Sequence, residues 1–291
     1  MLIRLALGFV WLLHFLPLAL LAPIGRGFGL LLYALAAERR KVTLTNLRLC
    51  FPEMSAAQRR RIARGHFQAF GRSVLERGLL WWSSRERVMR CVRVEGVEHW
   101  NAVRDRPVIW LAPHFVGLDM GGTRLAAEYA AVSVYSRQKN AAVDAILYHG
   151  RTRFVKPELY SRQDGIRPVV KAMRRKLPFY YLPDMDFGPR DSMFVPFFGV
   201  PAATIPGLHR IARLAGAVVV PVITTQLPGG QGYVLRFHRA WDNFPSADEA
   251  ADTRRMNAFI EDRVREHPEQ YFWAHKRFKT RPPGEPGFYT R

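Results

Sequence analysis

The sequence predicts an α/β protein with a largely parallel or mixed central sheet flanked by helices, preceded by an N-terminal membrane-anchor helix. Apolar runs alternate with helical patterns, the connections between them are short, and a long uncharged segment lies near the start of the chain. The 291 residues suffice for one large domain, and no Ser/Gly linker divides them. We expect residues 1–37 to form the anchor and residues 38–291 to form one domain.

The N-terminal segment carries no Asp, Glu, Lys or Arg from residue 5 to residue 25, and His14, Pro17 and Pro23 make it an imperfect helix. At about 1.5 Å per residue, a helix of this length crosses a hydrocarbon core of roughly 30 Å. A second apolar stretch, 27–37, is too short to cross. Arg39, Arg40 and Lys41 follow it, and the positive-inside rule then places the larger domain on the cytoplasmic side. A cleaved signal peptide and a buried helix of a soluble protein remain alternatives.

A helix start is predicted at Ser55–Gln58, which has the pattern of a capping box. The helix runs towards the paired residues Trp81 and Trp82. Two adjacent tryptophans before arginines suit a lipid headgroup layer or a protein core equally.

From residue 108 onward, short apolar runs alternate with helical patterns. The runs that predict strands are 108–112, 130–135, 179–182, 218–223 and 233–237. The patterns that predict helices are 118–129, 141–149, 166–176, 204–215 and 247–266. Ligands of such folds gather at the carboxyl ends of parallel strands, so residues that follow a strand are the first candidates for a functional site.

The chain is strongly basic, with 44 Lys and Arg against 24 Asp and Glu and a formal net charge of +20. This excess indicates an anionic partner: nucleic acid, an acidic membrane surface, a phosphorylated substrate or an acidic carrier protein. A basic surface that is simply solvated is the alternative. The 48% hydrophobic content excludes a disordered polymer. Cys50 and Cys91 form no Cys-x-x-Cys pair, so a redox or metal motif is not supported.

His114 is the leading candidate for a catalytic residue, because it directly follows the apolar run 108–112 and Pro113. Asp119 lies five residues on, past Gly117, where the chain can bend. A histidine within reach of a substrate hydroxyl acts as a general base near neutral pH, and a carboxylate on its other ring nitrogen fixes the tautomer. We therefore expect Asp119 to orient His114. A histidine with a purely structural hydrogen bond is the alternative.

Three arginines are candidates for binding an anionic substrate. Arg137 follows the strand predicted at 130–135, and Arg151 and Arg153 follow the next helix. A guanidinium binds phosphate oxygens in a bidentate manner or stabilises a developing oxyanion. Surface salt bridges are the alternative for each.

The turn after the predicted strand 179–182 holds Asp184, Asp186 and Arg190 around Pro and Gly residues. Either carboxylate is placed to hold the arginine or a sugar hydroxyl, and ordinary turn formation is the alternative. A metal site built from His149 and these carboxylates lacks recognisable ligand spacing. The apolar segment 194–199 is suited to line a binding slot for an acyl chain. The segment 271–279 interleaves rings and cations, which suits nucleic acid or a membrane surface.

Several of these segments together resemble the lipid A biosynthesis acyltransferases, the late or lauroyl/myristoyl type. The segments that carry the resemblance are His114–Asp119, Tyr135–Asn140, Gly150–Arg153, Pro183–Arg190, Phe194–Gly199 and Pro268–Pro282. They occur in the family's order over nearly the whole chain. His-x4-acid is shared by all glycerolipid-type acyltransferases, whereas Asp-x-Asp-Phe-Gly-Pro-Arg and Glu-Gln-Tyr-x-Trp are more selective. Asp119 stands where many relatives have Glu.

The resemblance implies an inner-membrane enzyme with a single-pass N-terminal anchor and an acyltransferase domain at the cytoplasmic face. It implies acyl-carrier protein as donor and, as acceptor, a hydroxyl of a 3-hydroxyacyl chain on a Kdo-bearing lipid A precursor. His114 is implied as general base and Asp119 as its partner, with Arg137, Arg153 and Arg190 at substrate-binding positions. No metal or organic cofactor is expected. Another glycolipid acceptor such as a phosphatidylinositol mannoside, a membrane-anchored nucleic-acid-binding module and an inactive relative remain alternatives.

Overall fold

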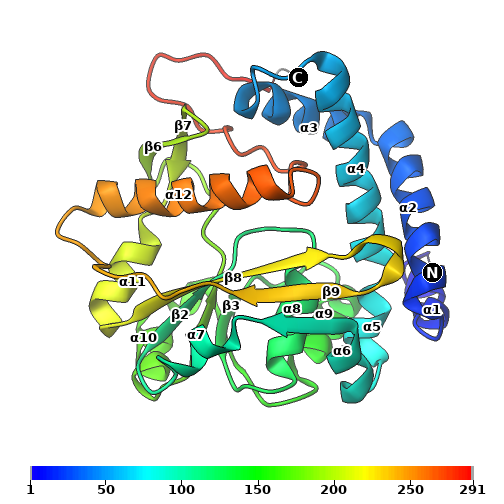
Figure 1. The fold of residues 1–291 in the computed structure, drawn as a ribbon, viewed down its shortest axis with the longest axis horizontal. Helices are drawn as coiled ribbons and strands as arrows, with labels where there is room; N and C mark the ends of the chain where they lie inside the picture. The colour runs from blue at the N-terminus through cyan, green and yellow to red at the C-terminus, as the bar shows by residue number, and fades with distance from the viewer. Residues whose placement is uncertain (1, 290–291) are drawn as a thin grey trace.

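The computed structural model describes residues 2–289 and has an α/β fold built on a seven-stranded sheet (Figure 1). The strand order is β1-β9-β8-β2-β5-β3-β4. The neighbours from β8 to β4 run parallel to one another. β9 is antiparallel to β8, and β1 is parallel to β9. The predicted α/β class with a mixed, largely parallel sheet is therefore confirmed.

The strands of this sheet are short except for β8. They are β1 (Val92–Glu95), β2 (Val108–Leu111), β3 (Val132–Tyr135), β4 (Glu158–Ser161), β5 (Phe179–Tyr181), β8 (Val218–Gln226) and β9 (Tyr233–Phe237). A separate antiparallel hairpin is formed by β6 (Met193–Phe197) and β7 (Val200–Thr204).

The helices fall into an N-terminal group and a group that alternates with the strands. The first group is α1 (Leu2–Leu13), α2 (Leu18–Leu35), α3 (Ala37–Cys50), α4 (Ala56–Leu75), α5 (Arg77–Trp82) and α6 (Arg85–Cys91). The second is α7 (Val97–Asn101), α8 (Leu118–Ala126), α9 (Ala141–Thr152), α10 (Arg167–Arg174), α11 (Gly207–Ala215) and α12 (Glu249–Glu266). The 3₁₀ turns η1 (Arg162–Asp164) and η2 (Pro228–Gly230) complete them.

The five predicted strands are present as β2, β3, β5, β8 and β9, and α8 to α12 lie within a few residues of their predicted ranges. The capping box at Ser55 opens α4, because the Ser55 hydroxyl accepts from the Gln58 amide and the Gln58 side-chain oxygen accepts from the Ser55 amide. One helix start differs. The helix predicted from residue 204 begins at Gly207, since Thr204 is the last residue of β7.

Both faces of the sheet are covered, and β2 shows how. All four of its residues are buried. Val108 and Trp110 face one apolar core together with residues of α2, α5, α7 and α8. Ile109 and Leu111 face the other core together with residues of α10, α11 and α12. Because successive side chains of a strand point to opposite faces, an entirely apolar strand is what a sheet buried on both sides requires.

The uncharged N-terminal segment is not the single helix predicted over 5–25. α1 ends at Leu13 and α2 begins at Leu18, with a turn between them. Pro17 is the N-cap residue of α2, and a proline cannot donate the backbone hydrogen bond that would continue α1. α2 is the one helix among residues 2–289 that is long and apolar enough to cross a membrane by length and composition.

α2 packs closely against α4, and the two run side by side in Figure 1. The glycines that permit this approach are Gly25, Gly29 and Gly71. A Cβ at Gly29 would lie 2.1 Å from the Phe67 carbonyl oxygen, and one at Gly71 would lie 2.4 Å from the Gly25 carbonyl oxygen. One side of α2 is therefore fixed against α4.

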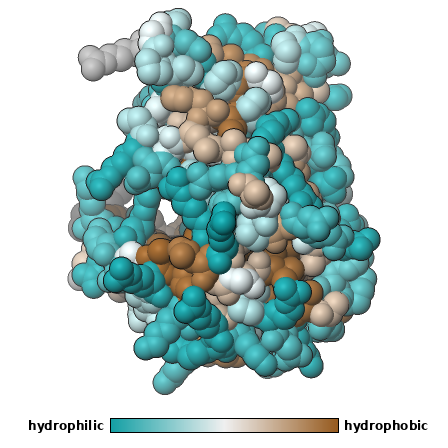
Figure 2. Space-filling view, turned by 90° about the vertical axis from the view of Figure 1, so that its left-hand side faces the viewer, coloured by the Kyte–Doolittle hydropathy of each residue, from teal (hydrophilic) through white to brown (hydrophobic). Residues whose placement is uncertain are grey.

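The other side of the N-terminal helices is apolar and exposed. Large apolar side chains left exposed there are Ile3, Leu5, Phe9, Trp11, Leu12, Phe15, Leu20, Ile24, Leu30, Leu31 and Leu35. Figure 2 views the molecule from the side opposite α1 and α2, and that face is mainly hydrophilic with only local apolar patches. The protein thus has one strongly apolar side, formed by its first 35 residues.

Candidate active site

The register of two neighbouring strands brings His114 and Asp184 together. β2 and β5 pair in parallel, with Leu111 opposite Tyr181. His114 comes three residues after Leu111, and Asp184 comes three residues after Tyr181. The two side chains therefore leave the carboxyl edge of the sheet at the same level, where ligands of such sheets are bound.

His114 is held to Asp184 by both its ring and its backbone. Its Nδ1 atom lies 2.7 Å from Oδ1 of Asp184. Its backbone N–H donates to the same carboxylate, 3.0 Å from Oδ2. An ionised carboxylate only accepts hydrogen bonds, so Nδ1 carries a proton, and in the neutral form of the ring Nε2 is the nitrogen with the free lone pair. The His114 side chain is 18% exposed while that of Asp184 is 1% exposed, so the imidazole alone is accessible.

The Asp184 carboxylate is stabilised in its charged form. Burial alone would raise its pKa, but the positive charge and hydrogen bonds of His114 and the Tyr271 hydroxyl outweigh burial, and the pKa is lowered. Burial, and then the negative charge of Asp184, raises the pKa of Tyr271 well above its usual value. Tyr271 therefore stays protonated and acts as a donor to the carboxylate.

Asp119 does not make the predicted hydrogen bond with His114. Its Oδ2 atom accepts instead from the guanidinium of Arg77 on α5, at 2.7 Å. The chain after Gly117 does not fold back on the imidazole, because α8 starts at Leu118 and Gly117 packs against the Thr224 carbonyl of β8. The segment after β5 supplies another carboxylate, that of Asp184, at the level of His114. Asp119 and Arg77 thus form a separate ion pair.

A C-terminal strap, defined as residues 270–280, encloses the site. Its backbone pairs with the segment after β2, since Val116 donates to the Gln270 carbonyl and Phe272 donates to the His114 carbonyl. Asp186 joins the strap to the β5 loop by accepting from both the backbone and the hydroxyl of Thr280. His275 Nε2 accepts from the Asp186 amide at 2.9 Å. Burial is the main cause that lowers the pKa of His275 to about 4, so it stays neutral.

The rings and one arginine of the strap lie in the core and not on a binding surface. Tyr271, Trp273, Arg277 and Phe278 are all buried. The Arg277 guanidinium donates to the Ala203 carbonyl and to the Thr204 hydroxyl. The interleaved pattern of rings and cations, which suited nucleic acid from sequence alone, therefore builds the fold.

Among residues 2–289, none of the predicted substrate-binding arginines forms a hydrogen bond or ion pair with His114. Arg137 and Arg190 are exposed, and Arg190 forms an ion pair with Asp191, at 3.6 Å. Arg153 donates to the carbonyl groups of Trp81 and Ser83 and ties α9 to the end of α5. Arg151 lines the cavity described below. Asp186 is occupied by the strap contacts, so Asp184 alone of this predicted set contacts the imidazole.

An apolar cavity of about 140 Å³ lies next to the site. Its walls come from α5, α8, α9 and the strands β3 and β5, with Trp81, Leu147, Val134 and Tyr180 among them. The Arg77–Asp119 pair and Leu182, two residues before Asp184, also line it. The sequence did not identify Arg77 or Tyr271 as site residues, although Tyr271 lies in a segment it had singled out.

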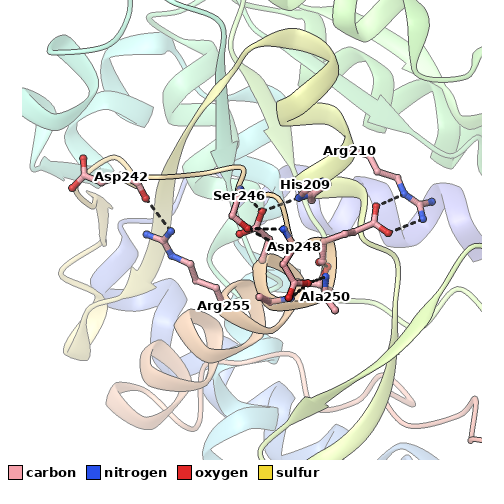
Figure 3. A network of polar contacts seen from close by, with 11 residues as sticks. His209, Arg210, Asp242, Ser246, Asp248, Ala250 and Arg255 are labelled. Carbon is pink, nitrogen blue, oxygen red and sulfur yellow. Dashed lines mark hydrogen bonds and ion pairs between the residues drawn. The ribbon is translucent and has the colours of Figure 1, made fainter.

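A second buried histidine–carboxylate pair has a structural role (Figure 3). His209 Nδ1 lies 2.8 Å from Oδ2 of Asp252, which also accepts from the Ser246 amide at 2.7 Å. Asp248 caps the start of α12. Both His209 and Asp252 are buried, so the pair fixes the loop before α12 and offers no accessible base. Among residues 2–289, no group of three His, Cys, Asp or Glu side chains is arranged to hold a metal ion.

Comparison with known proteins identifies the family of the chain. The family model of bacterial lipid A biosynthesis acyltransferases matches residues 1–280. The chain is 35% identical over 288 residues to the lipid A biosynthesis lauroyltransferase of Escherichia coli (strain K12), covering 98% of this chain and 94% of that protein. It is 33% identical over 275 residues to the lipid A biosynthesis myristoyltransferase of the same organism, covering 94% of this chain and 84% of that protein.

A solved structure with a distant likeness is the 1-acyl-sn-glycerophosphate acyltransferase of Thermotoga maritima, at a TM-score of 0.40 and 15% identity. The match covers 79% of this chain and 98% of that one, and it is too remote to bear on the reaction. The family match and the curated relatives each span nearly the whole chain. The chain therefore belongs to the bacterial lipid A biosynthesis acyltransferase family and is an acyltransferase of lipid A biosynthesis.

Proposed function

We propose that this acyltransferase moves a fatty acyl chain from acyl-carrier protein to the hydroxyl of a 3-hydroxyacyl chain on a Kdo-bearing lipid A precursor. The observation that carries the proposal is the His114–Asp184 pair at the carboxyl edge of the sheet, beside an apolar cavity. Relatives of this chain are named for lauroyl, myristoyl and palmitoleoyl transfer in lipid A biosynthesis, which are fatty acyl groups.

His114 acts as the general base in this proposal. Its Nδ1–H is held by Asp184, and Nε2 has no hydrogen-bond partner within the described part of the chain. A hydroxyl is a weak nucleophile at neutral pH, so removing its proton during attack speeds the reaction. The buried carboxylate stabilises the imidazolium that forms, without itself taking the proton.

The reaction balances with these groups alone. The hydroxyl oxygen forms a bond to the thioester carbonyl carbon while Nε2 takes the hydroxyl proton. The tetrahedral oxyanion then collapses and the carbon–sulfur bond breaks. The pantetheine sulfur leaves with the proton from the imidazolium, which gives an ester and a free thiol and restores neutral His114.

The remaining predicted site residues act around this centre. We assign the Asp119–Arg77 pair to the polar rim of the cavity, where it faces the thioester end of the donor. Arg137 and Arg190 follow β3 and β5 at the carboxyl edge and are exposed, so they are placed for an acidic carrier or for acceptor phosphates. Arg153 and Asp186 support the site by holding α9 and the strap.

We also propose that residues 1–37 hold the protein at the cytoplasmic face of the bacterial inner membrane. The exposed apolar side chains of α1 and α2 form one side of the molecule, and α2 is long enough to cross a bilayer. The net charge of +20 favours an anionic leaflet, where each Lys or Arg near the surface contributes about 1 kcal/mol.

Transfer from a loaded carrier protein to a purified lipid A precursor, read by mass, tests the function. Wild-type protein should add one acyl group, and His114→Ala should reduce kcat by about 100-fold or more, since a general base contributes that much. His149→Ala, at an exposed position of α9, is the matched control and should keep full activity.

Near-full activity of His114→Ala would contradict the general-base assignment. Lipid A of unchanged mass in a strain that lacks the protein would contradict the acceptor, and total lipid from the same strain would reveal another glycolipid acceptor.

A further inference from the structure

The apolar cavity beside His114 follows one face of α8. Asp119, Gly122, Thr123 and Ala126 all line it. Their spacing of three, four and seven residues places them on one side of the helix. The cavity is therefore a channel along the helix, and position along α8 measures depth within it.

One end of this channel is at the reaction centre. Asp119 lies in the first turn of α8, and Leu182 lies two residues before Asp184. The other end is at the amino edge of the sheet, where Ala126, Ala131 and Pro157 line the wall. At about 1.5 Å per residue, Gly122 lies about 4.5 Å deeper than Asp119, and Ala126 lies about 10 Å deeper.

The wall changes character along this axis. At the mouth stands the Arg77–Asp119 ion pair, whose side chains are 30% and 36% exposed. Deeper in, the wall includes Leu125 of α8, Val132 of β3 and Leu159 of β4, which are apolar. A polar rim over an apolar interior suits a molecule with one polar end and a hydrocarbon tail.

We propose that this channel holds the acyl chain of the donor, with the thioester at the Arg77–Asp119 rim, and that Gly122 and Ala126 set the length of chain accepted. The inference deepens the proposed function and rests on it for the identity of the donor. Each of the two small residues leaves space at its own depth. Enlarging either one closes the channel at that depth.

Gly122 is the position nearer to the rim. A Cβ there would lie 3.4 Å from Cε1 of Tyr180, an ordinary contact, and its backbone conformation is accessible to any residue. An alanine therefore fits, whereas a leucine extends into the space that the chain would occupy. Neighbouring Gly121 differs, because a Cβ there would lie 2.0 Å from the Thr224 hydroxyl, so it serves packing on β8.

The test is a competition among carriers loaded with acyl chains of increasing length, from chains shorter than the roughly 10 Å between Asp119 and Ala126 to chains longer than it. Ala126→Leu should reduce kcat/KM for the longest chains that wild type uses by about tenfold or more. The leucine side chain would occupy the space that the end of a long chain needs, and such overpacking is strongly unfavourable. Gly122→Leu should shift the preference to still shorter chains. Both variants should keep activity with the shortest donors, which shows that they fold.

Ala142→Leu is the matched control, since Ala142 is exposed on α9 and does not line the channel. It should keep the wild-type profile. Gly122→Ala is the milder companion and should shift the profile less than Gly122→Leu. An unchanged chain-length profile in both leucine variants, with transfer intact, would overturn the inference while leaving the proposed function standing.

Binding of free fatty acids to each variant, measured by native mass spectrometry, needs neither carrier nor acceptor. If wild type transfers nothing from a loaded carrier, the proposed function fails. The binding series still tests whether the channel limits the length of the chain that binds. A shorter longest-bound chain in Ala126→Leu supports the inference. Equal binding of all lengths by wild type and both leucine variants refutes it.

Discussion

The carboxylate of Asp184 engages Nδ1 of His114 and leaves Nε2 as the ring nitrogen with no hydrogen-bond partner among residues 2–289. Which carboxylate takes this position depends on strand pairing. The sequence singled out Asp119, Asp184 and Asp186, each near a predicted strand end. That β5 lies next to β2, with Leu111 opposite Tyr181, is a long-range fact that local patterns do not contain. The place of His114 directly after a strand was therefore predictable, whereas the carboxylate that contacts it required the fold, and the catalytic role of His114 stays a prediction.

Another buried imidazole gives the protein a pH-dependent stability. His66 of α4 is 1% exposed, and burial lowers its pKa to about 4, against about 6.5 in an unfolded chain. Between these values the unfolded state binds the proton that the folded state excludes, so stability should fall as pH drops from about 6.5 towards 4. His66→Gln should flatten this dependence by up to about 1.4 kcal/mol per pH unit.

Thermal unfolding midpoints of wild type and His66→Gln between pH 7 and pH 5 measure this effect. Only the slope against pH is compared, because the substitution itself shifts the midpoint. His149→Gln, at an exposed site, should leave the slope unchanged. Parallel slopes for wild type and His66→Gln would contradict the assignment.

At the scale of elements, strands buried on both faces were predictable and edge or hairpin strands were not. β2 is wholly apolar and β8 is apolar from Val218 to Ile223, which gives a clear signal. β1 (Val-Arg-Val-Glu) and β4 (Glu-Leu-Tyr-Ser) lie at the two edges of the sheet and carry polar residues. The N-terminal break was missed for a different reason. The absence of charge persists through Pro17, so only backbone chemistry marks the end of α1.

The packing of α2 on α4 should depend on Gly29. Any side chain there would meet the Phe67 carbonyl oxygen, so Gly29→Val should destabilise the protein by about 1–3 kcal/mol or displace α2. Gly27→Val is the matched control two residues away, because a Cβ at Gly27 has no atom within 4 Å. The unfolding midpoint in detergent measures both, and equal midpoints would contradict the close approach described here.

At the scale of the whole molecule, exposed apolar surface is unequally distributed. Most exposed large apolar side chains belong to residues 3–35, and the opposite face is mainly hydrophilic (Figures 1 and 2). Composition alone predicted an apolar N-terminus and an anionic partner. It did not predict that α2 would also pack on α4, which holds the proposed active site at one distance from the apolar side.

Membrane binding should therefore fail when charge is placed on that side. Phe9→Asp combined with Leu12→Asp should strongly reduce sedimentation with vesicles of anionic phospholipid, because both side chains are exposed on α1. Leu214→Asp changes an equally exposed side chain on α11, at the opposite side of Figure 1, and should sediment as wild type does. Equal loss in both variants would contradict the proposed orientation.

The pH dependence of kcat in Asp184→Asn and Asp119→Asn tests the central claim most directly. If Asp184 stabilises the protonated His114 ring, Asp184→Asn should lower the maximal kcat by about 100-fold or more and move the acid limb of the profile to lower pH. Asp119→Asn should leave that limb in its wild-type position, whatever it does to KM, because Asp119 pairs with Arg77. An acid limb displaced by Asp119→Asn and unmoved by Asp184→Asn would contradict the account.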